Sequence, residues 1–392
     1  MRKRNIIVTA ALLIFAVSPV SARAGEYEEL KTEMRMMKAR VVELEARLEQ
    51  YERTEKESAG HRAGHDHNHG EGFDIEIGHQ HRHLDIHQLR VHGGLDLRYV
   101  DAQGGKNKFF AHEVEIGVGA DLTDWLEAEI SLTKHHGEDV EVEQAYGKIK
   151  MEELRSVVKA GRFFVNFGPE NRAGFFDRRT VTPSAMREGF FGEENWTDEG
   201  IEISYRLPVG FESVISASAL NGNNAETFGN GNDPVDNNNI VAAFNVHNSV
   251  DTDWGRLTAG GSYARGKWDE DDTHAVDLFG LDAGWKLRNF DIQGEYMYRK
   301  KESDTGNIKG SGFYVWGAYT WPVEWKYLKD VGLLFSYGES HPEKTDKERR
   351  YSPQVTFGLT DTAQIRLLYE ILRESPDQID NNRLIAQFAY HF

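Results

Sequence analysis

The chain has 392 residues, a formal net charge of −18 and no cysteine. The lack of thiols excludes disulfide scaffolds, cysteine-ligated zinc sites and cysteine nucleophiles. The acidic excess argues against nucleic acid as a partner, because phosphate binding needs a basic surface. With 28% charged residues the chain is too polar for a helical membrane protein, yet it holds 21 Phe, 15 Tyr, 8 Trp and 38 Gly. Such a mixture is compatible with a soluble β protein, and also with a membrane β-barrel that has a polar lumen and an apolar outer face.

Residues 1–24 are predicted to be an export signal. Basic residues at 2–4 precede an apolar run over 6–17, which is short for a helix that spans a membrane. Ala-Arg-Ala at 22–24 provides the small-x-small pattern of a cleavage site, so the mature chain is expected to begin at Gly25 outside the cytoplasm. An uncleaved anchor helix is the alternative.

Residues 25–56 are predicted to form a short parallel coiled coil in the periplasm. Apolar residues recur at alternating spacings of three and four, at Tyr27, Leu30, Met34, Met37, Val41, Leu44, Leu48 and Tyr51. Flanking pairs such as Arg40 and Glu45 are opposite in charge, which favours the parallel arrangement. The mixed core does not decide between a dimer and a trimer, and a single amphipathic helix packed on a domain is the alternative.

Residues 57–87 form a histidine-rich linker. If the backbone is extended, alternating histidines place their imidazoles on one side, where they could share zinc, nickel or copper. The candidate ligands are His61, His65, His67, His69, His79, His81 and His83. The alternative is a solvated linker whose histidines respond to pH or do nothing. No cofactor is expected to be required, and no catalytic metal is expected.

Residues 88–392 are predicted to form an all-β transmembrane barrel, antiparallel and of about sixteen strands, preceded by the helical coiled coil. Apolar and polar residues alternate over segments of roughly ten residues, and short and long connections alternate between them. The expected strands are 88–101, 107–122, 124–136, 139–150, 153–166, 197–207, 210–222, 237–248, 253–267, 273–286, 288–302, 308–323, 329–340, 348–358, 361–374 and 382–392. The faces of residues 139–166 stay ambiguous. A soluble sandwich or propeller is the alternative, but aromatic outer faces of this kind would aggregate in water.

The last strand ends on Phe392 and alternates aromatic with polar residues. It resembles the assembly signal of Gram-negative outer-membrane proteins. This resemblance implies recognition by the barrel-assembly machinery and a location in the lipid of the outer membrane.

A barrel of this width can enclose water. The long charged connection over 167–199 is expected to fold inward and narrow the pore, although an ordinary exposed loop is the alternative. Opposed charges at such a constriction would select solutes by charge and dipole. The candidate constriction residues are Glu170, Arg172, Asp177, Arg178, Arg179, Arg187 and Glu188. The residues expected to line the pore are Glu113, Glu115, Glu127, Glu129, Glu202, Arg206, Glu295, Arg299, Arg366 and Glu370.

Three segments resemble the phosphate-selective porin-like (porin O/P-like) superfamily. They are Gly-Arg-Phe-Phe-Val-Asn-Phe-Gly-Pro-Glu-Asn at 161–171, Phe-Asp-Arg-Arg at 176–179 and Thr-Asp-Glu-Gly-Ile at 197–201. The order of signal, coiled coil, linker and barrel is similar to that of trimeric porins with a periplasmic coiled coil. A histidine-rich segment before such a barrel resembles members linked to zinc or other metals. The predicted lumen is acidic, whereas phosphate-selective members use a basic one, so cations are expected to be preferred.

We therefore expect a homotrimeric porin of the Gram-negative outer membrane with a periplasmic N-terminal region. It would be a passive diffusion channel for small hydrophilic solutes or ions, linked to uptake of a divalent metal such as zinc. The alternative is a structural protein that tethers the outer membrane to peptidoglycan through the coiled coil. No enzyme is expected, because no Ser/His/acid spacing is specific enough. His135 and His136 are expected to be solvated in an external loop.

Overall fold

The computed structural model describes residues 88–392 except for 193–194, 223–226, 229–239, 269–272, 344–346 and 376–380. The predicted export signal, coiled coil and histidine-rich linker lie outside the described residues. No helix among the described residues combines the length and the apolar character needed to cross a membrane.

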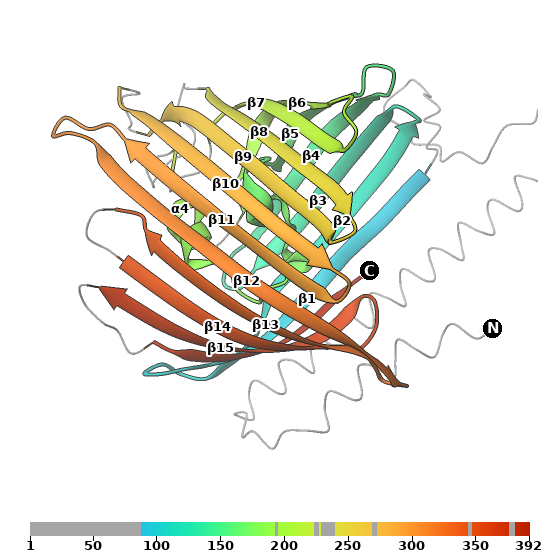
Figure 1. Ribbon diagram of the computed structural model, residues 1–392, viewed down its shortest axis with the longest axis vertical. Helices are drawn as coiled ribbons and strands as arrows, with labels where there is room; N and C mark the ends of the chain where they lie inside the picture. Colours follow the sequence, from blue (N-terminus) through green and yellow to red (C-terminus); the bar gives the residue numbers. More distant parts are fainter. Residues whose placement is uncertain are drawn as a thin grey trace, which may run out of the picture. The chain divides into compact units, whose positions relative to one another are not determined.

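Sixteen antiparallel strands close into one barrel (Figure 1), so the predicted fold class and strand count are confirmed. Each strand pairs with its neighbours in sequence, and β1 pairs with β16 to close the sheet. The strands are β1 (Gln88–Ala102), β2 (Lys108–Thr123), β3 (Leu126–His135), β4 (Val140–Met151), β5 (Ser156–Phe164), β6 (Thr197–Arg206), β7 (Glu212–Leu220), β8 (Val241–Thr252), β9 (Gly255–Lys267), β10 (Ala275–Leu287), β11 (Phe290–Lys301), β12 (Ile308–Trp325), β13 (Leu328–His341), β14 (Lys347–Gly358), β15 (Ala363–Ser375) and β16 (Arg383–His391).

The two faces of the sheet differ in polarity. On β6, Ile201 and Ile203 are 58% and 49% exposed on the outer face, whereas Glu202 between them is 5% exposed on the lumen face. Because side chains alternate along a strand, this difference places an apolar surface outside and a polar surface inside.

Aromatic side chains gather near both ends of the strands. The rings of Tyr263, Phe279 and Tyr298 adjoin one another across β9, β10 and β11 near one end of the barrel. Near the other end, Trp254 and Trp325 are strongly exposed. Two such belts are typical of barrels whose ends lie at membrane–water interfaces.

The connections are unequal at the two ends. Connections that follow even-numbered strands are short, such as Arg288–Asn289 between β10 and β11. The longest described connection joins β5 to β6. We call the two ends the short-turn end and the long-loop end. The described chain begins and finishes at the short-turn end, because β1 starts and β16 ends there.

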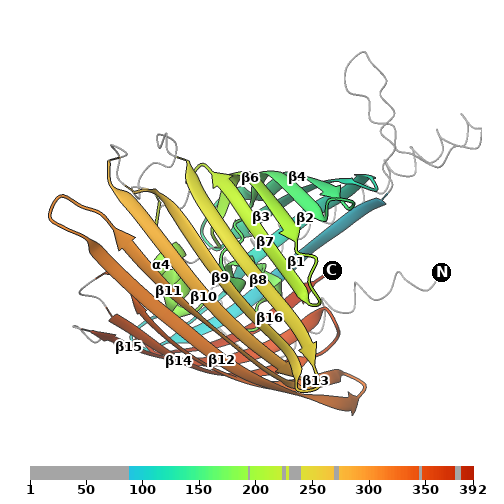
Figure 2. The same ribbon diagram turned by 45° about the horizontal axis from the view of Figure 1, so that its top comes forward.

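Residues 165–192 and 195–196, which we call the inward segment, pack against the lumen face of the barrel. They contain helix α3 (Gly168–Arg172), the 3-10 turn η2 (Phe175–Asp177) and helix α4 (Ala185–Phe191). Helix α3 contacts β9 and β10, and α4 contacts β12, β13 and β14. Figure 1 and the turned view in Figure 2 both show α4 surrounded by strands.

Large apolar side chains hold the inward segment in place. Phe167, Phe190 and Trp196 are fully buried together with Phe228 and Leu278. The Trp196 ring lies with its centroid 4.9 Å from that of Phe228 and 6.0 Å from that of Phe167. Complete burial of one such side chain stabilises a fold by roughly 1.5–3 kcal/mol, so this core fixes one side of the segment firmly to the wall.

Candidate pore constriction

Helix α4 is joined to the barrel wall by a bidentate ion pair. The guanidinium of Arg350 on β14 donates to both carboxylate oxygens of Glu188, at 3.1 and 2.5 Å, and to the carbonyl of Pro183 at 3.0 Å. The Arg350 side chain is only 5% exposed, so little water competes for these bonds. Burial alone would raise the pKa of Glu188, but the charge and hydrogen bonds of Arg350, with the charges of Arg383 and Arg187, together outweigh it, so the pKa lies below its ordinary value.

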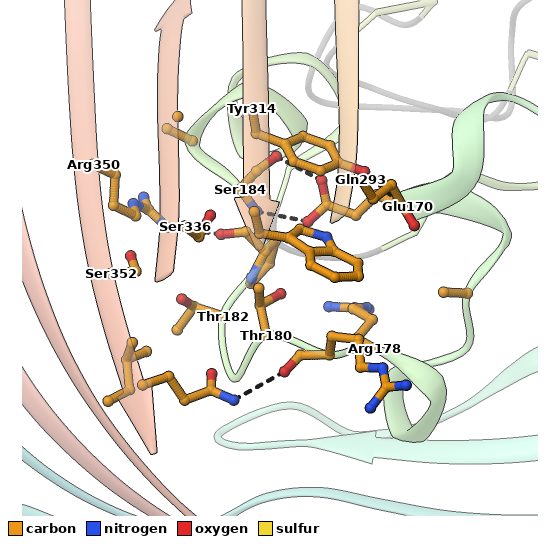
Figure 3. A pocket seen from close by; sticks show the side chains of 18 of the residues that line it. Glu170, Arg178, Thr180, Thr182, Ser184, Gln293, Tyr314, Ser336, Arg350 and Ser352 are labelled. Carbon is orange, nitrogen blue, oxygen red and sulfur yellow. Dashed lines mark hydrogen bonds between the residues drawn. The ribbon is translucent and has the colours of Figure 1, made fainter. Parts of the chain in front are cut away.

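A second set of bonds shapes the inward segment itself. Glu170 accepts hydrogen bonds from the backbone N–H of Ser184 at 2.7 Å and from its hydroxyl at 2.6 Å. The same hydroxyl accepts from the N–H of Arg187 and so caps α4. Figure 3 shows Glu170, Ser184 and Arg350 around a small cavity of about 80 Å³ between the segment and the strands.

Asn195 ties two arginines of the segment together. Its side-chain oxygen accepts from Arg178 and from Arg187, at 2.9 Å each. Its amide nitrogen donates to the carbonyl of Ala173 at 2.9 Å. Asn195, near the end of the segment, therefore holds Ala173, near its start, through these hydrogen bonds.

The tip of the segment is held by side chains of β14, β15 and β1. Gln354 on β14 accepts from the N–H of Val181 at 3.1 Å and donates to the carbonyl of Arg179 at 2.9 Å. Arg98 on β1 donates to the carbonyl of Val181 at 3.0 Å, and Thr182 donates to Glu370 on β15. The segment therefore bridges the lumen.

A polar cavity lies on each side of this bridge. The long-loop cavity has a volume of about 480 Å³, and Arg98, Glu113, His135, Glu143, Glu188 and Arg383 are among its lining residues. The short-turn cavity has a volume of about 360 Å³, and Asp177, Arg179, Lys329, Asp330, Arg366 and His391 are among its lining residues. Arg178 is among the lining residues of both cavities.

The residues predicted for the constriction fall in different surroundings. Asp177, Arg178, Arg179 and Glu188 line one or both of the large cavities, and Arg179 also lies 3.6 Å from Asp291. Glu170 lines the small cavity. Arg172 lies 3.9 Å from Asp282 on the wall. Arg187 is fully buried, so it supports the segment and does not face either cavity.

The residues predicted to line the pore also divide into groups. Glu113 lines the long-loop cavity and Arg366 the short-turn cavity. Buried on the lumen face are Glu202, Glu295, Arg299 and Glu370. Glu127 is paired with Lys148 and Lys150, Glu129 lies 2.6 Å from His92, and Glu115 is half-buried. Arg206 is exposed where β6 ends at the short-turn end.

Sequence reasoning missed several basic groups of the lumen. Arg98, Lys148, Lys159 and Arg350 face inward and lie near acidic residues. The alternation along β1 would have revealed Arg98, because it shares a face with Asp96. The lumen near the inward segment therefore carries both signs of charge side by side.

His135 does not lie in a loop, so its expected place was wrong. It is the last residue of β3, and its side chain is 18% exposed. It lines the long-loop cavity. Two groups of side chains there have ligand atoms within 4.8 Å of one another: Glu113 with Glu115 and Glu143, and His135 with Glu138 and Glu141.

No protein-family model matches the chain. It is 24% identical over 291 residues to an uncharacterized protein of Aquifex aeolicus (strain VF5), a match that covers 64% of this chain. The chain spans 61% of the length of that relative. The resemblance to the porin O/P-like superfamily stays a prediction.

Solved barrels are similar in fold. A loop-deletion mutant of the outer membrane protein OmpT of Vibrio cholerae matches with a TM-score of 0.56 and 10% identity, covering 78% of this chain and 99% of that one. The anion-selective porin of Comamonas acidovorans gives 0.55 and 14%, covering 78% and 99%. Salmonella typhi OmpF, solved with daunomycin, gives 0.54 and 13%, covering 78% and 97%. At these identities the likeness shows the fold.

Proposed function

We propose that the protein is an outer-membrane porin, a passive diffusion channel for small hydrophilic solutes and ions. The observation that carries this proposal is the pair of polar cavities, one on each side of the inward segment, that share Arg178 inside a closed barrel. An apolar outer face with an aromatic belt near each end supports insertion in a bilayer. Passive channels need no cofactor.

The proposed orientation places the short-turn end in the periplasm. Barrels of the outer membrane have short periplasmic turns and longer extracellular loops. The predicted coiled coil over 25–56 would then extend into the periplasm, and the predicted histidine-rich linker would lie at the periplasmic mouth. We further propose a homotrimer, in line with the trimer form in which Vibrio cholerae OmpT was solved. Phe392 would serve recognition by the barrel-assembly machinery.

The proposed selectivity follows from the wall of the long-loop cavity. The carboxyl groups of Glu113, Glu115 and Glu143 lie together on β2 and β4. Glu113 and Glu143 line the cavity, and Arg98 and Arg178 line it as well. Charges of opposite sign across a narrow path create a transverse field that orders ions and dipoles. We propose a cation preference along the acidic wall and a link to divalent-metal uptake through the linker histidines.

Planar-bilayer recording tests this function. Insertion of the purified full-length chain should give stepwise conductance increases, and unequal KCl across the bilayer should give a reversal potential of the sign for cation preference. The rival structural role predicts negligible conductance and co-sedimentation of the chain with peptidoglycan. Stepwise conductance without cation preference would support the channel function and refute the proposed selectivity.

A further inference from the structure

The wall of the long-loop cavity gathers ligand-type side chains from three neighbouring strands. Glu113 and Glu115 share one face of β2, and strand pairing sets Glu113 opposite His135 of β3. The next lumen-facing pair sets Glu115 opposite Thr133. Glu143 belongs to β4, on the far side of β3. Such a three-strand patch has a fixed backbone on every side.

Two irregularities in strand pairing turn extra side chains into this patch. Between β1 and β2, Asp96 pairs with Glu113 and Leu97 with Ala111, which leaves His112 as an extra residue. Between β3 and β4, Ser131 pairs with Gln144 and Leu132 with Val142, which leaves Glu143 as an extra residue. Bulges of this kind re-aim side chains and are frequent beside functional sites. Both His112 and Glu143 line the cavity.

The carboxylates of Glu113, Glu115 and Glu143 lie unusually close together. One oxygen of each lies within 4.8 Å of the others. Glu113 is only 2% exposed, and within the described part of the chain its Oε1 has no hydrogen-bond partner. Three carboxylates at this spacing repel one another unless a positive charge lies among them or protons bind. A buried carboxylate oxygen without a partner is a feature that an ion would satisfy.

An imidazole and a hydroxyl complete the surroundings. Nδ1 of His135 lies 3.8 Å from Oε2 of Glu113, and its Nε2 lies 3.8 Å from Oε1 of Glu141, so the imidazole stands between the carboxyl group of Glu113 and that of Glu141. The Thr133 hydroxyl donates to Oε2 of Glu143 at 2.6 Å and so orients that carboxylate. Ordered partners of metal-binding carboxylates fix ligand geometry in this way.

We propose that Glu113, Glu115 and Glu143 bind a divalent cation in the wall of the long-loop cavity, with His135 as the fourth ligand. Three oxygens and one imidazole suit a borderline ion such as Zn²⁺ better than Ca²⁺, which prefers oxygen alone. Ligand atoms lie about 2.0–2.2 Å from a zinc ion, so the side chains would close on the ion by rotation. This site is separate from the linker histidines.

The ion would also affect the path of solutes. Arg178 lines the same cavity, so a bound divalent cation would add positive charge near the narrow point and reduce cation current. This effect on current rests on the proposed channel function, whereas binding of the ion does not.

The binding test uses the full-length chain with the seven candidate ligands of the linker replaced by alanine, which removes the competing predicted site. Titration calorimetry with ZnCl₂ should show one ion bound per chain. Glu113→Gln and Glu143→Gln should each weaken binding by more than the roughly 10- to 100-fold that loss of an outer-shell partner costs. Glu127→Gln is the matched control, because it removes a lumen carboxylate that is already paired with Lys148 and Lys150. Absence of Zn²⁺ binding, or equal binding by all three variants, would overturn the proposal.

A CaCl₂ arm tests the role of His135. Zn²⁺ should bind more tightly than Ca²⁺, and His135→Ala should remove this preference because it removes the nitrogen ligand. An unchanged preference in His135→Ala would refute the imidazole ligand. Heat-modifiable gel mobility and circular dichroism establish that each variant is folded. Glu113→Asp keeps a carboxylate at this position and should retain part of the affinity for Zn²⁺.

Bilayer recording separates the two proposals. Zn²⁺ added at the long-loop side should lower the current of the linker-histidine variant, and Glu143→Gln should abolish the effect. If the chain conducts current but does not bind Zn²⁺, the proposed metal site is refuted and the proposed channel function is retained. Zn²⁺ binding without any current refutes the channel and leaves the metal site.

Discussion

Glu188 of helix α4 accepts two hydrogen bonds from the guanidinium of Arg350 on β14. The two residues are far apart in sequence, so this pair fixes a segment inside the lumen to a strand of the wall. The same guanidinium donates to Pro183, just before the helix. The pair therefore sets both the position of α4 and the approach to it.

Removal of the Arg350 charge should loosen the inward segment. In Arg350→Ala, Glu188 would lose its bidentate partner, and hydrogen bonds to a charged group contribute about 1.5–3 kcal/mol. We expect larger mean conductance and more current noise in bilayers. Arg349→Ala is the matched control, because Arg349 is the next residue and bonds to Glu339, not to the segment. Wild-type conductance and noise in Arg350→Ala would contradict this role.

Acid should loosen the same contact. The pKa of Glu188 in the folded chain lies below its ordinary value, since Arg350, Arg383 and Arg187 together outweigh the effect of burial. At pH values above the ordinary pKa of a glutamate, the Glu188 carboxylate therefore stabilises the anchored segment. This contribution is lost as the pH falls through the lowered pKa of the folded chain. Current noise should stay constant from neutral pH to moderately acid pH and rise only below the ordinary glutamate range.

Glu188→Gln is the control for this pH dependence. It should be noisy at all pH values and should lack the acid transition that depends on residue 188. An equal acid transition in Glu188→Gln would assign the change to another group.

Gly168 is required at the start of the inward segment. Its φ is +65°, and a Cβ atom there would overlap a side-chain oxygen of Glu295 on β11. A non-glycine residue in this conformation costs about 1–3 kcal/mol, apart from the clash. Gly168→Ala should lower the yield of folded, heat-modifiable barrel. Gly174→Ala is the matched control. The φ of Gly174 is −56°, and the nearest atom would lie 3.5 Å from the new Cβ, so the yield of folded barrel should be unchanged.

The strands could be predicted because their chemistry is local. Alternation along β6, for example, distinguishes Ile201 and Ile203 from Glu202 without knowledge of any neighbour. The faces of β4 could not be predicted, because the extra residue at Glu143 shifts the phase of alternation within the strand. Glu141 and Tyr146 therefore both face inward although their spacing is odd.

The site could be predicted only in part, for a related reason. The charge and length of the segment over 167–199 are visible in the sequence. The residues that bind the segment are not visible in the sequence, because Arg350, Gln354 and Glu370 come from strands more than 150 residues later. His135 lies within the predicted strand 124–136, yet its solvated position was wrong, because its partial burial depends on the pairing of β3 with β2. Such pairing follows from closure of the barrel, not from local pattern.

Arg178 should control ion selectivity, since this residue is among those that line the cavities on both sides of the inward segment. A unit charge about 4 Å from a passing ion contributes about 1 kcal/mol in water, which is roughly a fivefold change in permeability ratio. Arg178→Gln removes the charge and keeps a donor for Asn195, so reversal potentials in unequal KCl should move toward cations. Arg178→Lys keeps the charge and should stay close to wild type.

The matched control for Arg178 is Arg206→Gln, which removes the same charge at the exposed end of β6. Salt screens such an exposed charge over about 10 Å at 0.1 M. The reversal potential of Arg206→Gln should therefore change little. A shift in Arg206→Gln as large as in Arg178→Gln would mean that selectivity arises at the short-turn mouth. Equal potentials in Arg178→Gln and wild type would show that the permeant path avoids the guanidinium.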